Sequence, residues 1–135
     1  MKALSANITR GLNHGSLIQV CDNSGAKQLR IISITGQKTV KGRYPRAAVS
    51  DLIQASVVKG VQSMRKQVVL AIIVRQKKEY KRPDGTRVAF EDNAAIVLRD
   101  DKGNPKGTIF KGPIAKEVSE RWPSVAKVAS IVVKK

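Results

Sequence analysis

The apolar run Val68-Val69-Leu70-Ala71-Ile72-Ile73-Val74 is rich in β-branched residues and is bounded by charged segments. A short continuous apolar run of this composition is typical of a strand that is buried on both faces. We therefore expect a central strand here, with Val69, Ala71 and Ile73 in the core. Ile72 and Val74 join the core if the strand is covered on its second face.

Other strand-like segments lie on both sides of this run. They cover residues 17–21, 27–34, 51–58, 87–90 and 94–98, and Phe90 is a further candidate core residue. Turns rich in Asp, Asn, Gly and Pro occupy residues 22–25, 82–86 and 100–105, and residues 36–50 suggest a long loop or ribbon tip. Five or six short strands with frequent turns predict a mainly β fold, either a small closed barrel or a sandwich.

The C-terminal quarter has a different pattern. Ile114, Val118 and Trp122 recur at near-helical spacing after Pro113, which predicts a helix from Pro113 that Pro123 stops. Residues 129–133 predict a final β segment. No linker-like segment divides the 135 residues, so we expect a single domain.

Charge is the strongest compositional signal. The chain has 26 Lys and Arg against 10 Asp and Glu, a formal net charge of +16. A net charge this high creates a strong positive electrostatic field, which attracts a polyanionic partner, either nucleic acid or an anionic membrane surface. A membrane is the poorer fit, because no apolar run approaches the roughly 20 residues of a spanning helix. Residues 1–10 lack the apolar stretch of a secretory signal, so we expect a cytoplasmic protein.

The basic residues form two blocks. No acid occurs between Asp22 and Asp51, and a second block from Lys59 to Arg87 holds nine bases with only Glu79 and Asp84 as acids. A solvated surface would mix both signs, so the blocks favour phosphate binding. The residues expected to supply most of the phosphate contacts are Lys27, Arg30, Lys38, Lys41, Arg43, Arg46, Lys59, Arg65, Lys66, Lys77, Lys78, Lys81 and Arg82.

Catalysis has little support in the sequence. General acid–base chemistry usually needs positioned histidine or carboxylate groups, and the chain has one histidine, His14, and one cysteine, Cys21. We expect Cys21 to be a small buried residue and His14 to lie in an exposed loop. No phosphate-binding or metal-binding motif is present, so we predict no catalytic residues, no metal and no cofactor.

Aromatic residues are few and scattered, which argues against the stacking platform of a single-strand binder. Recognition of folded RNA by its shape and backbone fits better. Tyr44 and Tyr80 lie inside the basic blocks, where each could stack on a base or pack a loop against the barrel. The sequence leaves both possibilities open.

Three collinear segments resemble the universal large-subunit ribosomal protein fourteen family. The first is residues 22–27, Asp-Asn-Ser-Gly-Ala-Lys, which resembles an early strand–turn motif. Residues 71–94 and 106–117 resemble the central and C-terminal signatures of this family. Residues 122–126 and the leader 1–16 are similar to its archaeal and eukaryotic branch.

The resemblance implies a small five-stranded β-barrel with a projecting β-ribbon and a short helical C-terminal part. It implies an N-terminal extension at 1–16, a barrel core at 17–110 and a C-terminal part at 111–135. It further implies a structural constituent of the large ribosomal subunit that binds large-subunit rRNA at the intersubunit face. The implied partners are small-subunit rRNA across a bridge, the large-subunit protein three family and the anti-association factor, initiation factor six.

The C-terminal third is the expected protein-binding region. Residues 91–135 carry nine bases and six acids, a net charge of only +3, and the single Trp. Mixed charges and aromatic anchors suit protein contacts, but Trp122 could equally pin the helix to the barrel. The resemblance decides between these, because it implies that neighbouring ribosomal proteins and the anti-association factor dock in this region. We therefore expect Glu117, Glu120 and Arg121 to be exposed and to meet a protein partner. Two other readings remain: an RNA-modifying or RNA-cleaving enzyme subunit, and a free nucleic-acid chaperone or translation factor with an oligonucleotide-binding barrel.

Overall fold

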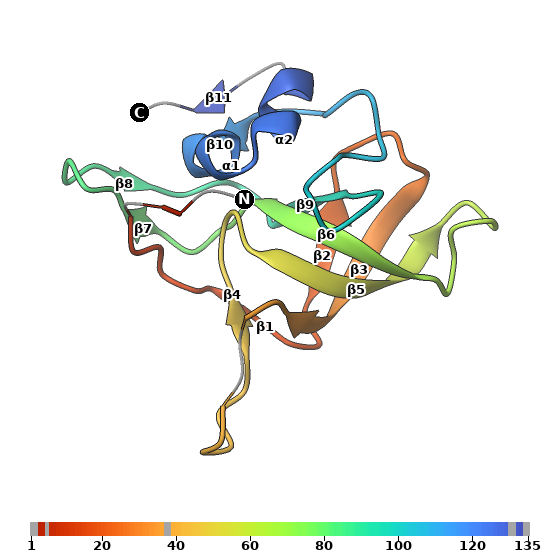
Figure 1. Ribbon diagram of the computed structural model, residues 1–135, viewed down its shortest axis with the longest axis horizontal. Coiled ribbons are helices and arrows are strands. Elements are labelled where there is room, and N and C mark those ends of the chain that lie inside the picture. Colours follow the sequence, from red (N-terminus) through yellow and green to blue (C-terminus); the bar gives the residue numbers. More distant parts are fainter. Residues whose placement is uncertain (1–2, 5, 37–38, 130–131, 134–135) are drawn as a thin grey trace.

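The computed structural model describes residues 3–4, 6–36, 39–129 and 132–133 and contains a closed five-stranded barrel (Figure 1). Its strands are β2 (Leu17–Val20), β3 (Ala26–Ile34), β5 (Leu52–Gly60), β6 (Val68–Arg75) and β9 (Ala94–Val97). They pair antiparallel in this order, and β2 closes the barrel by pairing parallel with β9. The predicted mainly β fold is confirmed, and the barrel rather than the sandwich is the form it takes.

Strand β6 contributes to two hydrophobic cores. Ala71 and Ile73 point into the barrel, where they join Leu29 and Ile53. Ile72 and Val74 belong to a second cluster that includes Ile96, Ile114, Val118 and Trp122. Because side chains alternate between the faces of a strand, a strand between two cores needs apolar residues at every position. This requirement explains why the part of the run from Ala71 to Val74 is apolar at every position.

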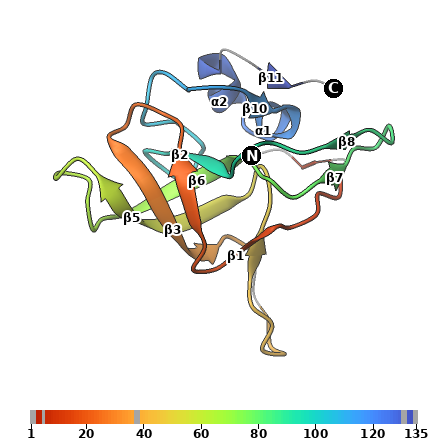
Figure 2. The same ribbon diagram turned by 180° about the vertical axis from the view of Figure 1, so that it is seen from behind.

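The remaining elements lie outside the barrel. They are the pair β1 (Leu12–Asn13) with β4 (Arg46–Ala47), the pair β7 (Tyr80–Lys81) with β8 (Arg87–Val88), and the C-terminal elements β10 (Ile114–Ala115), α1 (Lys116–Arg121), α2 (Pro123–Val128) and β11 (Val132–Val133). Figures 1 and 2 show the C-terminal elements gathered on one side of the barrel, opposite the β1–β4 pair. This layer contributes Ile114, Val118, Trp122 and Val125 to the second apolar cluster, which they form together with residues of the barrel.

Two expected core residues are only partly buried. Ala71, Ile72, Ile73 and Val74 are fully buried, as predicted, but Val69 and Phe90 are partly exposed and Val68 is 62% exposed. The C-terminal layer therefore covers the second half of β6 and leaves its first half at the surface. Phe90 follows β8, which pairs with β7 and takes no part in the barrel, so the expected strand at 87–90 is not a barrel strand.

The C-terminal helix begins later than the sequence predicts, and a second helix follows it. Ile114 and Ala115 pair parallel with Val132 and Val133, so α1 begins only at Lys116. Helix α1 ends at Arg121 with Trp122 as its C-cap, so it stops before Pro123 as predicted. A second helix, α2, then begins at Pro123, whose missing N–H costs nothing in a first turn. The predicted final β segment is confirmed at Val132–Val133, and residues 130–131 lie outside the described ranges.

The N-terminal segment packs against the barrel and the C-terminal layer. Ile8 contacts the second apolar cluster, and the carbonyl of Thr9 accepts a hydrogen bond of 2.9 Å from Gln76 Nε2. Leu12 then pairs with Ala47. Within the described ranges, no helix is both long and apolar enough to cross a membrane.

Candidate nucleic-acid interface

Most of the expected rRNA-binding residues that the structure describes lie on three projections from the barrel (Figure 1), and the other two, Lys27 and Arg30, lie on barrel strand β3. We call these projections the ribbon loop (described residues 35–36 and 39–46), the β5–β6 turn (residues 59–67) and the β7–β8 hairpin (residues 77–87). Figures 1 and 2 show that they leave the barrel in three different directions. The second basic block of the sequence is thus divided, because the eight residues of β6 separate its two parts by about 26 Å.

The ribbon loop carries Lys41, Arg43 and Arg46, all exposed. Its base is fixed by the β1–β4 pair, in which Asn13 lies opposite Arg46. Lys38 was also expected to bind rRNA and lies outside the described residues. The described part of this loop therefore exposes three cations, and the β1–β4 pair anchors its base.

The β5–β6 turn carries Lys59, Arg65 and Lys66, all exposed. Its backbone is internally bonded, since the N–H groups of Met64 and Arg65 both donate to the carbonyl of Val61. Lys66 has a positive φ of 63°, a left-handed conformation that turns the chain back toward β6. Lys27 and Arg30 are exposed on β3, beside β5, and extend this basic surface along the barrel.

The β7–β8 hairpin carries Lys77, Lys78 and Lys81, again exposed. The buried amide of Gln76 fixes its start, because Oε1 accepts the Val49 N–H at 3.0 Å and Nε2 donates to the carbonyl of Lys78 at 2.9 Å. The Lys77 N–H donates to Asn93 Oδ1 at 2.8 Å. These bonds hold the lysine backbone in place while the ammonium groups remain in solvent.

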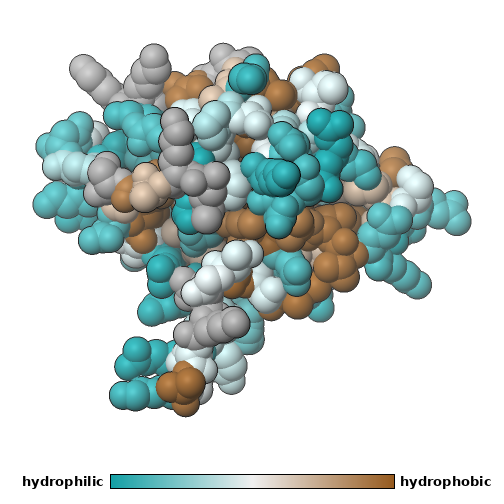
Figure 3. All heavy atoms as spheres, viewed as in Figure 1, coloured by the Kyte–Doolittle hydropathy of each residue, from teal (hydrophilic) through white to brown (hydrophobic). Residues whose placement is uncertain are grey.

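Figure 3 shows how polarity is distributed on one face of the molecule. Hydrophilic side chains predominate on the projections, and an apolar band crosses the barrel between them. The exposed apolar residues on the barrel include Ile32 of β3 and Val68 of β6. On this face the hydrophilic side chains are therefore gathered on the projections, whereas part of the barrel surface is apolar.

Arg82 was expected to bind phosphate, but the structure places it inside the protein. Its side chain is 4% exposed, and Nε donates to Glu117 Oε1 at 2.8 Å. Tyr80 is fully buried and its hydroxyl donates to Glu117 Oε2 at 2.9 Å. The expectations that Arg82 reaches RNA and that Glu117 is exposed are therefore wrong. Of the two possibilities left open for Tyr80, its burial shows packing inside the protein rather than stacking on a base.

The Tyr80–Arg82–Glu117 cluster ties the β7–β8 hairpin to α1. Burial raises the pKa of Tyr80 above its usual value, and the Glu117 carboxylate raises it further. The phenol consequently stays protonated and acts as the donor to Glu117. A buried carboxylate is tolerated here because a guanidinium and a hydroxyl both donate to it.

Of the other expected protein-contact residues, Glu120 is exposed and forms an i,i+4 pair with Lys116 at 3.6 Å. Arg121 is partly buried and pairs with Asp51 at 3.4 Å. The exposed part of α1 is thus its Lys116–Glu120 face.

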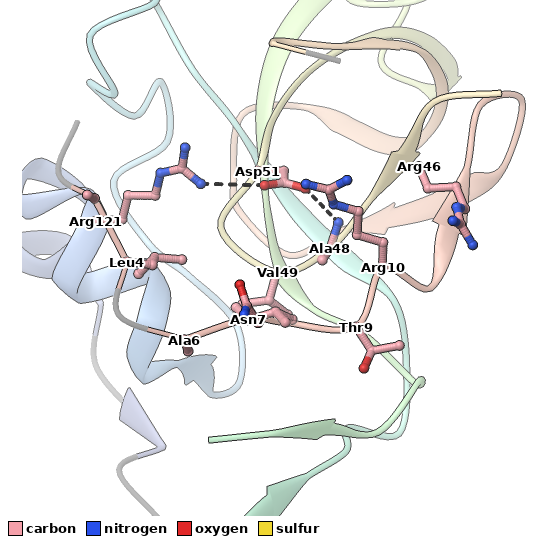
Figure 4. Close-up of a pocket in the computed structure, with 12 residues that line it drawn as sticks. Leu4, Ala6, Asn7, Thr9, Arg10, Arg46, Ala48, Val49, Asp51 and Arg121 are labelled. Carbon is pink, nitrogen blue, oxygen red and sulfur yellow. Dashed lines mark hydrogen bonds and ion pairs between the residues drawn. The ribbon is translucent and has the colours of Figure 1, made fainter. Parts of the chain in front are cut away.

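Arg121 lies at the edge of a pocket of about 600 Å³ between the N-terminal segment and the barrel (Figure 4). Arg121 and Arg10 approach Asp51 from opposite sides, whereas Arg46 points away. Burial raises the pKa of Asp51, an effect opposed by the Ala48 N–H and by the two guanidinium groups. The carboxylate is thereby occupied in joining three segments of the chain, which is a structural role.

Catalytic and metal chemistry find no support in the described residues. These contain no group of three or more His, Cys, Asp or Glu side chains that could hold a metal ion. Cys21 is 4% exposed, as expected for a structural cysteine, and burial raises its pKa to about 11, so its thiol is not ionised at neutral pH. His14 is only partly exposed, because Tyr44 covers it.

The family model for ribosomal protein L14p/L23e matches residues 11–133 of this chain. The chain belongs to the L14p/L23e family. Its relatives include large ribosomal subunit protein uL14 of Natronomonas pharaonis, 51% identical, and that of Nanoarchaeum equitans, 52% identical. Each alignment spans 133 residues, 98% of this chain and 100% of the relative.

Haloarcula marismortui uL14, another L14p/L23e relative, is 51% identical over the same 98% of the chain. All three organisms are archaea, which confirms the predicted placement in the archaeal and eukaryotic branch. Members of the L14p/L23e family are structural ribosomal proteins, so the chain is not an enzyme. Family membership thereby excludes the two alternatives, an RNA-modifying or RNA-cleaving enzyme subunit and a free nucleic-acid chaperone or translation factor.

We predict that Glu117→Ala destabilises this L14p/L23e protein by about 3–5 kcal/mol, because the buried Arg82 guanidinium loses its carboxylate. Glu120→Ala removes an exposed carboxylate from the same helix and should cost at most about 0.5 kcal/mol. Urea unfolding followed by Trp122 fluorescence measures both. Equal, small effects of the two substitutions would show that the buried cluster does not hold the hairpin to α1.

Proposed function

We propose that the protein binds large-subunit rRNA through its three basic projections and the exposed basic residues of β3, acting as one rRNA-binding domain. Membership of the L14p/L23e family makes it a structural constituent of the large ribosomal subunit, and hence a cytoplasmic protein. The observation that supports rRNA binding is the exposure of cations on separate, anchored projections. The proposed contact residues are Lys27, Arg30, Lys38, Lys41, Arg43, Arg46, Lys59, Arg65, Lys66, Lys77, Lys78 and Lys81.

The arrangement suits a folded RNA more than a single strand. Projections that leave a rigid barrel in different directions can reach phosphates of several helices at once, which fixes the orientation of the protein. Lys and Arg contacts to phosphates carry little sequence information, so recognition rests on the shape of the RNA. Each neutralised phosphate releases counterions, which makes the affinity depend on salt.

We predict that binding to a large-subunit rRNA transcript weakens by about 10³–10⁵-fold between roughly 50 and 200 mM salt, as expected for six to ten phosphate contacts. The double variant Lys77→Gln/Lys78→Gln should bind more weakly and should lower the salt slope, by about 1 for each phosphate that the variant no longer neutralises. Filter binding across a salt series measures affinity and slope together.

The matched control is Lys102→Gln/Lys127→Gln, which removes two lysines of the C-terminal third. It makes the same change in net charge but lies away from the projections, so its slope should stay close to that of the unmodified protein. A flat salt dependence would contradict rRNA binding through phosphates. Equal losses of affinity from the two double variants would mean that total charge, rather than the projections, determines binding.

We further propose that α1 offers a docking surface for the anti-association factor, initiation factor six. Its support is the exposed Lys116–Glu120 face on a C-terminal third of low net charge. Glu117 is withdrawn from this surface because it is buried, and Arg121 is largely engaged with Asp51. Contacts with small-subunit rRNA across a bridge and with the protein three family rest on the family resemblance alone.

The charge swap Lys116→Glu/Glu120→Lys tests the docking surface. It keeps the net charge and the i,i+4 pair while reversing the pattern that a partner meets. We expect weaker binding of factor six to purified large subunits, with unchanged incorporation of the variant into those subunits. Unchanged factor binding, measured by co-sedimentation, would place the docking surface elsewhere.

A further inference from the structure

We propose that Tyr44, on the ribbon loop, stacks on an unpaired base of the rRNA. The inference rests on the proposed rRNA binding and adds a contact that phosphate attraction does not supply. It comes from the juxtaposition of an exposed aromatic ring with three exposed cations on one projection. Lys41, Arg43 and Arg46 surround Tyr44 in the sequence, and the side chains of all four are exposed.

Exposure separates Tyr44 from the other four aromatic residues, and all five lie in the described ranges. Tyr44 is 75% exposed, whereas Tyr80, Trp122 and Phe110 are buried and Phe90 is partly buried. A ring of this size is normally placed in a core or an interface, because it removes a large apolar area from water. In the isolated chain the ring of Tyr44 lies in neither a core nor an interface, so a binding partner could bury it.

The ring is nevertheless held in position. Its centroid lies 4.7 Å from that of His14, and the two rings are nearly perpendicular at 80°. The His14 N–H donates to the carbonyl of Pro45 at 3.3 Å, next to the β1–β4 pair. A side chain that is ordered before binding loses less conformational freedom on binding, which favours a role in recognition.

The surrounding charges indicate RNA as the partner. Every base has an aromatic face, so a tyrosine can stack on any unpaired base while neighbouring cations bind the adjacent phosphates. The sequence has no acid between Asp22 and Asp51, so the ribbon loop offers no partner for a basic protein surface. Its charge is complementary to a phosphate backbone instead.

The test compares Tyr44→Ala, Tyr44→Leu and Tyr44→Phe in binding to a large-subunit rRNA transcript. Alanine and leucine should each weaken binding about 5- to 150-fold, the range expected for losing one base–aromatic stack, and phenylalanine should bind like the unmodified protein. The salt slope should not change, because no charge is removed. Ultraviolet cross-linking and mass spectrometry should find a nucleotide attached to Tyr44.

Other outcomes separate this inference from the proposed function. Unchanged affinity of the alanine variant, with a steep salt slope, would refute stacking and leave phosphate binding intact. A loss with phenylalanine equal to that with alanine would assign the effect to the hydroxyl and likewise refute stacking. A flat salt slope in the unmodified protein would overturn the proposed function itself. Thermal unfolding of each variant confirms that the fold is retained, as expected for an exposed side chain.

Discussion

The pairing of β6 with β9 is the constraint on which the rest of the structure depends. Both strands are buried on both faces where they pair, so their side chains alternate between the barrel interior and the cluster under the C-terminal layer. Neither core can form completely without the other, since each takes every second residue of the same ladder. The barrel and its C-terminal layer are therefore one packing unit, and the projections extend from a rigid base.

Buried polar contacts, together with the apolar cores, fix the outer elements to one another and to the barrel. The carbonyl of Ser50 accepts a 2.9 Å hydrogen bond from Trp122 Nε1, which anchors the indole between the C-terminal layer and the barrel. Gly103 lies against the face of the same indole, where no Cβ would fit. The Tyr80–Arg82–Glu117 cluster anchors the β7–β8 hairpin in a similar way. Buried polar groups of this kind are costly to leave unpaired, so each one restricts how the elements can be arranged.

Much of the barrel could be predicted from the sequence, because its strands show local patterns of apolar and β-branched residues bounded by turns. Residues 87–90 could not be assigned correctly, because a short strand has the same local pattern whether it joins a barrel or an outer hairpin. The early start assigned to α1 has a similar cause: Pro113 is a helix-start signal, but Ile114 and Ala115 pair with β11 through long-range contacts. The candidate site was predicted less well. Arg82 and Glu117 are 35 residues apart and look like surface charges, although the inward position of Tyr80 in a period-2 hairpin could have indicated that Arg82 points inward too.

We propose two roles for two parts of the surface: rRNA binding for the cationic projections, and protein binding for the C-terminal layer. Lysine acetylation of the free protein and of large subunits without bound factor, read by mass spectrometry, tests this division most directly. Lys41, Lys59, Lys66, Lys77, Lys78 and Lys81 should react in the free protein, where all are exposed, and be protected in the subunit, whereas Lys116 should remain reactive. Projection lysines that react equally in both states, together with a protected Lys116, would contradict the division.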